Sequence, residues 1–115
     1  MAAGPLIQAI EEVDDSLHQK SRLAIMATLA AIGEASFLQL RESTQLSDGN
    51  LSTHLSALER KNYVEINKSF QGKRPHTSVR ATEAGLRAFT EYLAALESVI
   101  AQARGDNRHE ENSAK

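Results

Sequence analysis

Residues 46–62 hold the side chains best suited to hydrogen-bonding chemistry, and these side chains recur at helical spacing. Leu51, Leu55 and Leu58 follow one another at i, i+4 and i+7, which places them on one face of a helix. The opposite face consists mainly of small, uncharged side chains, where solvated helices usually carry Glu and Lys. Side chains of this kind can approach base edges in the major groove of DNA and exchange hydrogen bonds with them. The stretch therefore predicts a DNA-recognition helix.

The candidate DNA contacts on this helix have short polar or positively charged side chains. Asn50 and Thr53 are candidates for base or phosphate contact, although surface or turn-forming roles would explain the same residues. His54 flanks the leucine stripe, so packing is the simpler interpretation of its position. Arg60 and Lys61 follow Glu59 in the chain, and pairing with Glu59 at the surface would account for their positive charges. The full set is Asp48, Gly49, Asn50, Ser52, Thr53, His54, Ser56, Arg60 and Lys61, with Arg41 on the preceding helix as a candidate DNA-backbone contact.

A second candidate group lies at residues 71–76, which read Gln-Gly-Lys-Arg-Pro-His between two strand-like segments. Gly supplies a positive φ and Pro blocks a ladder, so we expect a hairpin tip over these residues. An Arg presented by a hairpin suits the negative potential of a narrow minor groove. Simple solvation of a tip by Lys and Arg is the alternative. The candidates are Gly72, Lys73, Arg74 and His76.

Seven predicted elements must position these groups. Apolar periodicity predicts helices over about residues 5–16 and 18–32, with Gly33 as a stop. Ser36 and Gln39 form a capping-box pattern for a short helix that ends near residue 44, and Ser47 is placed to cap the next helix. Two short helices joined by a tight turn make a helix-turn-helix. Strands follow at 63–70 and 77–80, and Thr82 caps a long final helix.

The blocks LSTHLSALE (51–59), YV (63–64), GKRP (72–75) and TEAG (82–85) resemble winged-helix transcriptional regulators close to the MarR and ArsR repressors. The resemblance covers about residues 15–96 and is strongest to compact members with one extra helix at each end. It implies a mainly α fold with a small β-hairpin, a winged helix-turn-helix whose wing reaches the minor groove. Ala81 departs from the pattern, in which Leu is common, and this weakens one core contact.

The flanking helices carry more apolar surface than one small domain would bury, which favours an interface with a second copy of the chain. The alternative is that these two helices bury each other within one chain. The candidate interface residues are Leu6, Ile10, Val13, Phe89, Tyr92, Leu93, Leu96 and Ile100. We therefore expect dimerisation helices at 1–17 and 82–104, a DNA-binding domain at 18–81 and a disordered tail at 105–115.

Composition sets the outer limits. A chain of 115 residues with 41% hydrophobic residues makes one domain with a modest core. The absence of Cys excludes disulfides and thiolate sites. No apolar run reaches the roughly 18 residues that span a bilayer, and the first residues do not read as a signal peptide. We expect a cytoplasmic protein without a membrane partner.

The net charge of −2 argues against a nucleic-acid partner, but the charge is unevenly distributed. Residues 1–19 carry four acidic and no basic residues, whereas residues 34–80 hold seven basic and five acidic residues. The basic middle permits DNA binding without proving it.

Catalysis has little support in the sequence. The four His residues are scattered, no Gly-rich phosphate loop opens a helix, and the acidic cluster at residues 11–15 is typical of a solvated face. We expect no enzyme, metal or cofactor, and no residue set identifies an effector. The sequence predicts a homodimeric regulator, a repressor by resemblance, that binds double-stranded DNA at a pseudo-palindromic operator. The alternative is a winged helix used only for protein interaction.

Overall fold

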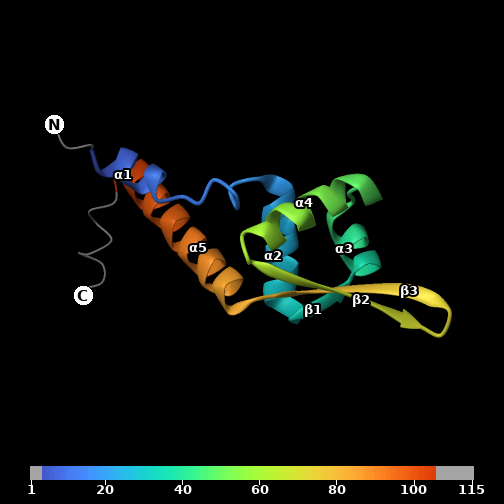
Figure 1. Ribbon diagram of the computed structural model, residues 1–115. Helices are drawn as coiled ribbons and strands as arrows, with labels where there is room; N and C mark the ends of the chain where they lie inside the picture. The colour runs from blue at the N-terminus through green and yellow to red at the C-terminus, as the bar shows by residue number, and fades with distance from the viewer. Residues whose placement is uncertain (1–3, 106–115) are drawn as a thin grey trace.

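The computed structural model describes residues 4–105. Its elements follow the order α1 (Pro5–Glu11), α2 (Lys20–Ile32), β1 (Glu34–Ser36), α3 (Phe37–Thr44), α4 (Asp48–Arg60), β2 (Val64–Gln71), β3 (Arg74–Ala81) and α5 (Glu83–Ala103). Helices α2, α3 and α4 form a body, the β2–β3 hairpin projects from one side of it, and α5 extends from the other side with α1 alongside (Figure 1). The prediction of a mainly helical chain with a small sheet is confirmed.

The sheet is antiparallel, with strand order β1-β3-β2. The short strand β1, which the sequence did not predict, pairs with β3 only as far as Ser36 opposite Ser78. Beyond that pair β3 is an edge on this side, so Pro75 is tolerated inside the strand. The predicted tip at 71–76 was wrong in its extent, because Gln71 pairs with Arg74 and only residues 72–73 turn. Gly72 supplies the positive φ of 65°.

The predicted helix caps are confirmed. The Ser36 hydroxyl accepts from the Gln39 amide at 3.0 Å while the Gln39 side chain accepts from the Ser36 amide at 2.8 Å. Ser47 caps α4 through the Asn50 amide at 3.2 Å. Thr82 caps α5 through the Gly85 amide at 2.9 Å. These local bonds fix the helix starts, and the core then closes over α2 through buried side chains at Leu17, Ile25, Met26, Leu29, Leu40, Leu51, Leu58, Val64 and Val79.

Helix α1 ends at Glu11, and the prediction that it runs to residue 16 was wrong. The carboxylate of Asp14 accepts the amides of Ser16 at 2.8 Å and Leu17 at 3.2 Å, which gives these donors a local partner in place of a helical one. The resulting turn places Leu17 in the core with no exposed surface. We call residues 12–19 the strap, because they run between α1 and the body.

The start of α5 lies directly against the chain that leaves α4. The Thr82 amide donates to the Tyr63 carbonyl at 3.0 Å, and the Thr82 hydroxyl donates to the Asn62 carbonyl at 2.6 Å. A Cβ placed on Gly85 would lie 2.1 Å from the Tyr63 carbonyl oxygen. Only glycine therefore permits this approach, and the TEAG block serves to join α5 to the body.

Within residues 4–105, no helix is both long and apolar enough to cross a membrane. Apart from Gly105, the predicted tail lies outside the described residues.

Candidate functional site

Helix α4 has the two faces that the sequence predicted. Its buried side chains are Leu51, Leu55, Ala57 and Leu58. Its exposed small side chains are Gly49, Asn50, Ser52, Thr53 and Ser56, which we call the polar face. The Thr53 hydroxyl donates to the Gly49 carbonyl at 2.9 Å, so its remaining hydrogen-bonding capacity is that of an acceptor. The polar face thus offers mixed donors and acceptors without a fixed charge.

His54 differs from the other predicted contacts because its ring is engaged within the protein. Nε of Arg22, on α2, donates to Nδ1 of His54 at 3.2 Å, and Nη1 of the same Arg donates to the Ser16 hydroxyl at 3.2 Å. Partial burial and the positive charge of Arg22 lower the pKa of His54. A neutral ring with Nδ1 as acceptor therefore ties α4 to α2 and, through Ser16, to the strap.

Arg41 and Asp48 form an ion pair at 2.7 Å that joins α3 to the first turn of α4. The bond and the charge of Asp48 raise the pKa of Arg41. Both side chains are exposed, so solvent screens the pair and it contributes little to stability. Arg60 and Lys61 are exposed at the C-terminal end of α4, and Nζ of Lys61 lies 5.8 Å from the centre of the Tyr63 ring.

The β2–β3 hairpin, which we call the wing, presents the second predicted group. Lys73 lies in the turn, and Arg74 begins β3 opposite Gln71. Both are exposed, and neither belongs to an ion pair within residues 4–105, whereas Arg80 nearer the body pairs with Glu65 at 2.7 Å. His76 lies opposite Ser69 and is partly buried. The positive charge of the wing is therefore concentrated near its turn.

A groove separates the polar face from the wing. It is lined by Ser52, Leu55 and Ser56 of α4, by Phe37 of α3 and by Ile66, Lys68 and Thr77 of the wing. Sequence reasoning missed Lys68 and Thr77, which lie directly opposite each other in the hairpin. The strand alternation from the buried Val64 through Ile66 to Lys68 was the signal that could have placed Lys68 on this side.

We call α1 and α5 together the arm. Helix α1 packs on α5 and buries Ala9, while α5 buries Tyr92 and Ala95. The prediction of Tyr92 as an interface residue was wrong, because it is 2% exposed and its hydroxyl hydrogen-bonds Nδ1 of His18 at 3.1 Å. The other predicted interface residues divide into partly buried Val13, Phe89 and Leu96 and exposed Leu6, Ile10, Leu93 and Ile100.

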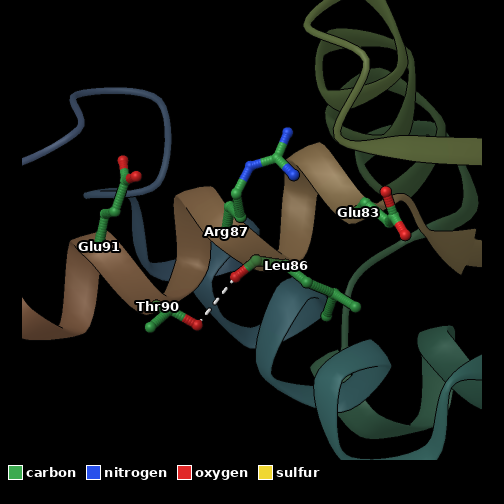
Figure 2. Close-up of a pocket in the computed structure, with 5 residues that line it drawn as sticks. All are labelled: Glu83, Leu86, Arg87, Thr90 and Glu91. Carbon is green, nitrogen blue, oxygen red and sulfur yellow. Dashed lines mark hydrogen bonds between the residues drawn. The ribbon is translucent and has the colours of Figure 1, made fainter.

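The base of α5 has a shallow hollow on its outer side, lined by Glu83, Leu86, Arg87, Thr90 and Glu91 (Figure 2). The Thr90 hydroxyl donates to the Leu86 carbonyl at 3.0 Å, and the charged side chains stand apart from one another around this bond. The apolar part of the hollow is the exposed Leu86. All the residues that line the hollow belong to α5, so it includes none of the polar face of α4.

The chain is similar to proteins with known sequences and structures. Residues 21–100 match the family model described as a winged helix DNA-binding domain. An uncharacterized protein of Methanocaldococcus jannaschii is 38% identical over 72 residues, which are 63% of this chain and 78% of that protein. A transcriptional regulator homologue from Pyrococcus horikoshii superposes with a TM-score of 0.76 at 30% identity, covering 86% of this chain and 96% of its own. The transcriptional repressor BigR of Xylella fastidiosa shares the fold, with a TM-score of 0.60, 24% identity and coverage of 76% and 83%.

Proposed function

Since the chain belongs to the family of winged helix DNA-binding domains, we propose that it is a sequence-specific transcriptional regulator that binds operator DNA as a homodimer. Residues 18–81 would bind DNA, and the segments 1–17 and 82–104 would join two copies. A repressor is the simplest such regulator, because occupancy of an operator alone can block transcription. The observation that carries the proposal is the side-by-side placement of the uncharged polar face of α4 and the basic wing.

The DNA contacts follow from the chemistry of these two surfaces. The polar face is narrow enough to enter a major groove, and Asn50 and Thr53 on it offer hydrogen-bonding groups to base edges. Arg60, Lys61 and Lys73 would meet phosphates, and Arg74 would lie in the neighbouring minor groove. Arg41 forms an ion pair with Asp48 in the absence of DNA. A phosphate near α3 would compete for that guanidinium.

Selection of binding sites from random duplex DNA, followed by affinity measurements on the selected site, tests this assignment. Asn50→Ala and Arg74→Ala should each weaken binding by about 1–3 kcal/mol if they contact bases. Affinity should also fall steeply as the salt concentration rises, because bound counterions are released. Arg104→Ala, at the far end of α5, removes the same charge as Arg74→Ala and should leave binding unchanged. If no site is enriched, the winged helix serves protein contact instead. If a site is enriched but both variants bind it like the parent, the assignment of Asn50 and Arg74 as base contacts is refuted.

The homodimer rests on the exposed apolar residues of the arm. Leu86, Leu93 and Ile100 are 40%, 42% and 48% exposed and recur every seven residues along α5. Seven-residue spacing is the pattern of helices that pack along one another. Leu6, Ile7 and Ile10 of α1 add 42%, 55% and 53% exposed side chains to the same arm. A two-fold axis through the arm would present two α4 helices to half-sites about one helical turn apart, or a multiple of that.

Sedimentation of Leu93→Glu against the parent tests the dimer. Leu93 is exposed, so the substitution should not disturb the fold of one chain. In the dimer it would place two negative charges, one from each copy, inside the proposed interface. We expect the variant to sediment as a monomer and to lose affinity for a two-half-site operator. Glu91→Gln, an exposed change on the same helix, is the matched control and should remain dimeric. A parent that sediments as a monomer at all concentrations tested would refute the dimer.

A further inference from the structure

Phe70 is the most exposed of the large apolar side chains in residues 4–105. It lies near the end of β2 and is 70% exposed, whereas the exposed leucines and isoleucines of the arm are 40–55% exposed. An exposed aromatic side chain loses the large favourable free energy that its burial would contribute. Phe70 therefore has no role in the core. Phe70 belongs to β2. The wing and α5 project from opposite sides of the body, which separates this strand from the proposed dimer surface (Figure 1).

The strand register shows which side of the wing carries Phe70. Residues directly opposite in an antiparallel pair project from the same face, and the successive opposed pairs of one face are Ile66 with Val79, Lys68 with Thr77 and Phe70 with Pro75. Val79 is buried under the helices, and Lys68 and Thr77 line the groove beside α4. Phe70 and Pro75 come next along this face. They therefore extend the side of the wing that faces the groove.

The charges around this apolar pair indicate its partner. Lys68 precedes Phe70 on the same face, and Lys73 and Arg74 follow it at the turn, all three exposed. A rigid apolar pair surrounded by positive charge fits duplex DNA, in which phosphates flank stacked bases. Minor-groove proteins insert apolar side chains, Phe and Pro among them, between base steps and kink the duplex.

We propose that Phe70, backed by the ring of Pro75, enters the minor groove, partly unstacks one base step and thereby bends the bound DNA. The inference rests on the proposed function, because it assigns a role within the same DNA complex. Pyrimidine–purine steps such as TA are the easiest to unstack, so Phe70 adds sequence preference at a position where no hydrogen bond is read.

Two measurements on the selected operator test this wedge. Fluorescence of 2-aminopurine placed at successive steps reports unstacking, and energy transfer between dyes at the two DNA ends reports bending. The parent should raise the fluorescence at one step near the wing and shorten the end-to-end distance. Phe70→Ser should lose most of both signals and about tenfold in affinity, whereas Phe70→Leu, which keeps an apolar wedge, should retain both in large part. Ile32→Ser, which removes a 53% exposed apolar side chain from the body, is the matched control and should behave like the parent.

The possible failures are distinguishable. If the parent enriches no DNA site, the proposed function fails and the wedge fails with it. If the parent binds its site without unstacking or bending, or if Phe70→Ser binds and bends DNA like the parent, the wedge is refuted while the proposed function stands. If Phe70→Ser loses affinity equally on operators with TA and with a stiffer step at the same position, Phe70 makes an ordinary contact and the inference is also overturned.

Discussion

Helices α2 and α5 are both rich in apolar residues, yet they bury opposite kinds of side chain. Helix α2 buries Ile25, Met26 and Leu29. Helix α5 buries Gly85, Ala95 and one large residue, Tyr92. Its aliphatic residues at seven-residue spacing, Leu86, Leu93 and Ile100, are exposed to solvent. Burial of large side chains therefore fixes α2 within the chain. Close backbone approach and hydrogen bonds fix the base of α5, which leaves its aliphatic side free for another surface.

The largest expected effect comes from comparing one leucine on each helix. Leu29→Ala removes a fully buried side chain and should lower the free energy of unfolding by about 3 kcal/mol. Leu93→Ala, at a 42% exposed position, should cost less than about 0.5 kcal/mol in a dilute monomer and more as the concentration rises. Urea titrations at two protein concentrations measure both. Equal losses at low concentration would show that α5 is fixed by its leucines after all.

A methyl group at the base of α5 tests the role of close approach. Gly85→Ala would force Cβ to 2.1 Å from the Tyr63 carbonyl oxygen, so the helix or the chain at Tyr63 must move. We expect a loss of about 2 kcal/mol, since overpacking against backbone outweighs the gain in helix propensity. Gly49→Ala on α4 is the matched control: no atom lies within 4 Å of its Cβ, so stability should hold or rise. Thermal unfolding of the two variants measures both effects. A Gly85→Ala variant as stable as the parent would contradict the role of close approach.

The features that the sequence predicted well are those determined by neighbours in the chain. Ser36 with Gln39, Ser47 and Thr82 cap their helices through residues only three positions away. The errors arose where a distant segment decides the outcome. Pro75 continues a strand because β1 ends at Ser36, and no local pattern reveals that edge. Tyr92 lies in the core, and its hydroxyl hydrogen-bonds the ring of His18, which is 74 residues earlier in the chain.

The candidate site divides in the same way. The polar face of α4 follows from helical periodicity, so the sequence located it. The position of His54 beside the leucine stripe favoured packing, but its contact with Arg22 spans 32 residues and leaves no local signal, so the sequence did not identify this partner. The groove residue Lys68 became visible only from the strand register. Which of these residues touch DNA stays a prediction.

A smaller effect is expected from the strap, which contacts both the body and α5. The Tyr63 hydroxyl donates to Asp14 at 2.7 Å. Burial and this bond raise the pKa of Tyr63 to about 12. Burial alone would raise the pKa of Asp14. The hydrogen bonds from the Tyr63 hydroxyl and from the amides of Leu17 and Ser16 outweigh burial, so the pKa of Asp14 is lowered overall. Tyr63→Phe should therefore cost about 1 kcal/mol at neutral pH.

The pH dependence separates that bond from simple packing. A lowered carboxyl pKa gives stability that is present above the unfolded value, about 3.9, and is lost as the pH falls through the folded pKa. The difference between the parent and Tyr63→Phe should then narrow below about pH 4. Urea titrations at pH 7 and pH 3 measure it. A difference that stays constant with pH would assign the loss to packing of the ring alone.

The smallest effect is expected at His54, where α4 meets α2 and the strap. Its lowered pKa means that the folded state resists protonation, so stability is fully present above the unfolded value, about 6.5, and declines as the pH falls through the folded pKa. His54→Gln keeps an acceptor for Arg22 but removes the titration, and should therefore lose less stability than the parent between pH 7.5 and pH 5. His76→Gln on the wing is the matched control, and unfolding midpoints at these two pH values compare all three proteins. Because the ring is only partly buried, we expect a difference of a few tenths of a kcal/mol. An identical decline in His54→Gln and the parent would show that burial and the charge of Arg22 do not lower the pKa of His54.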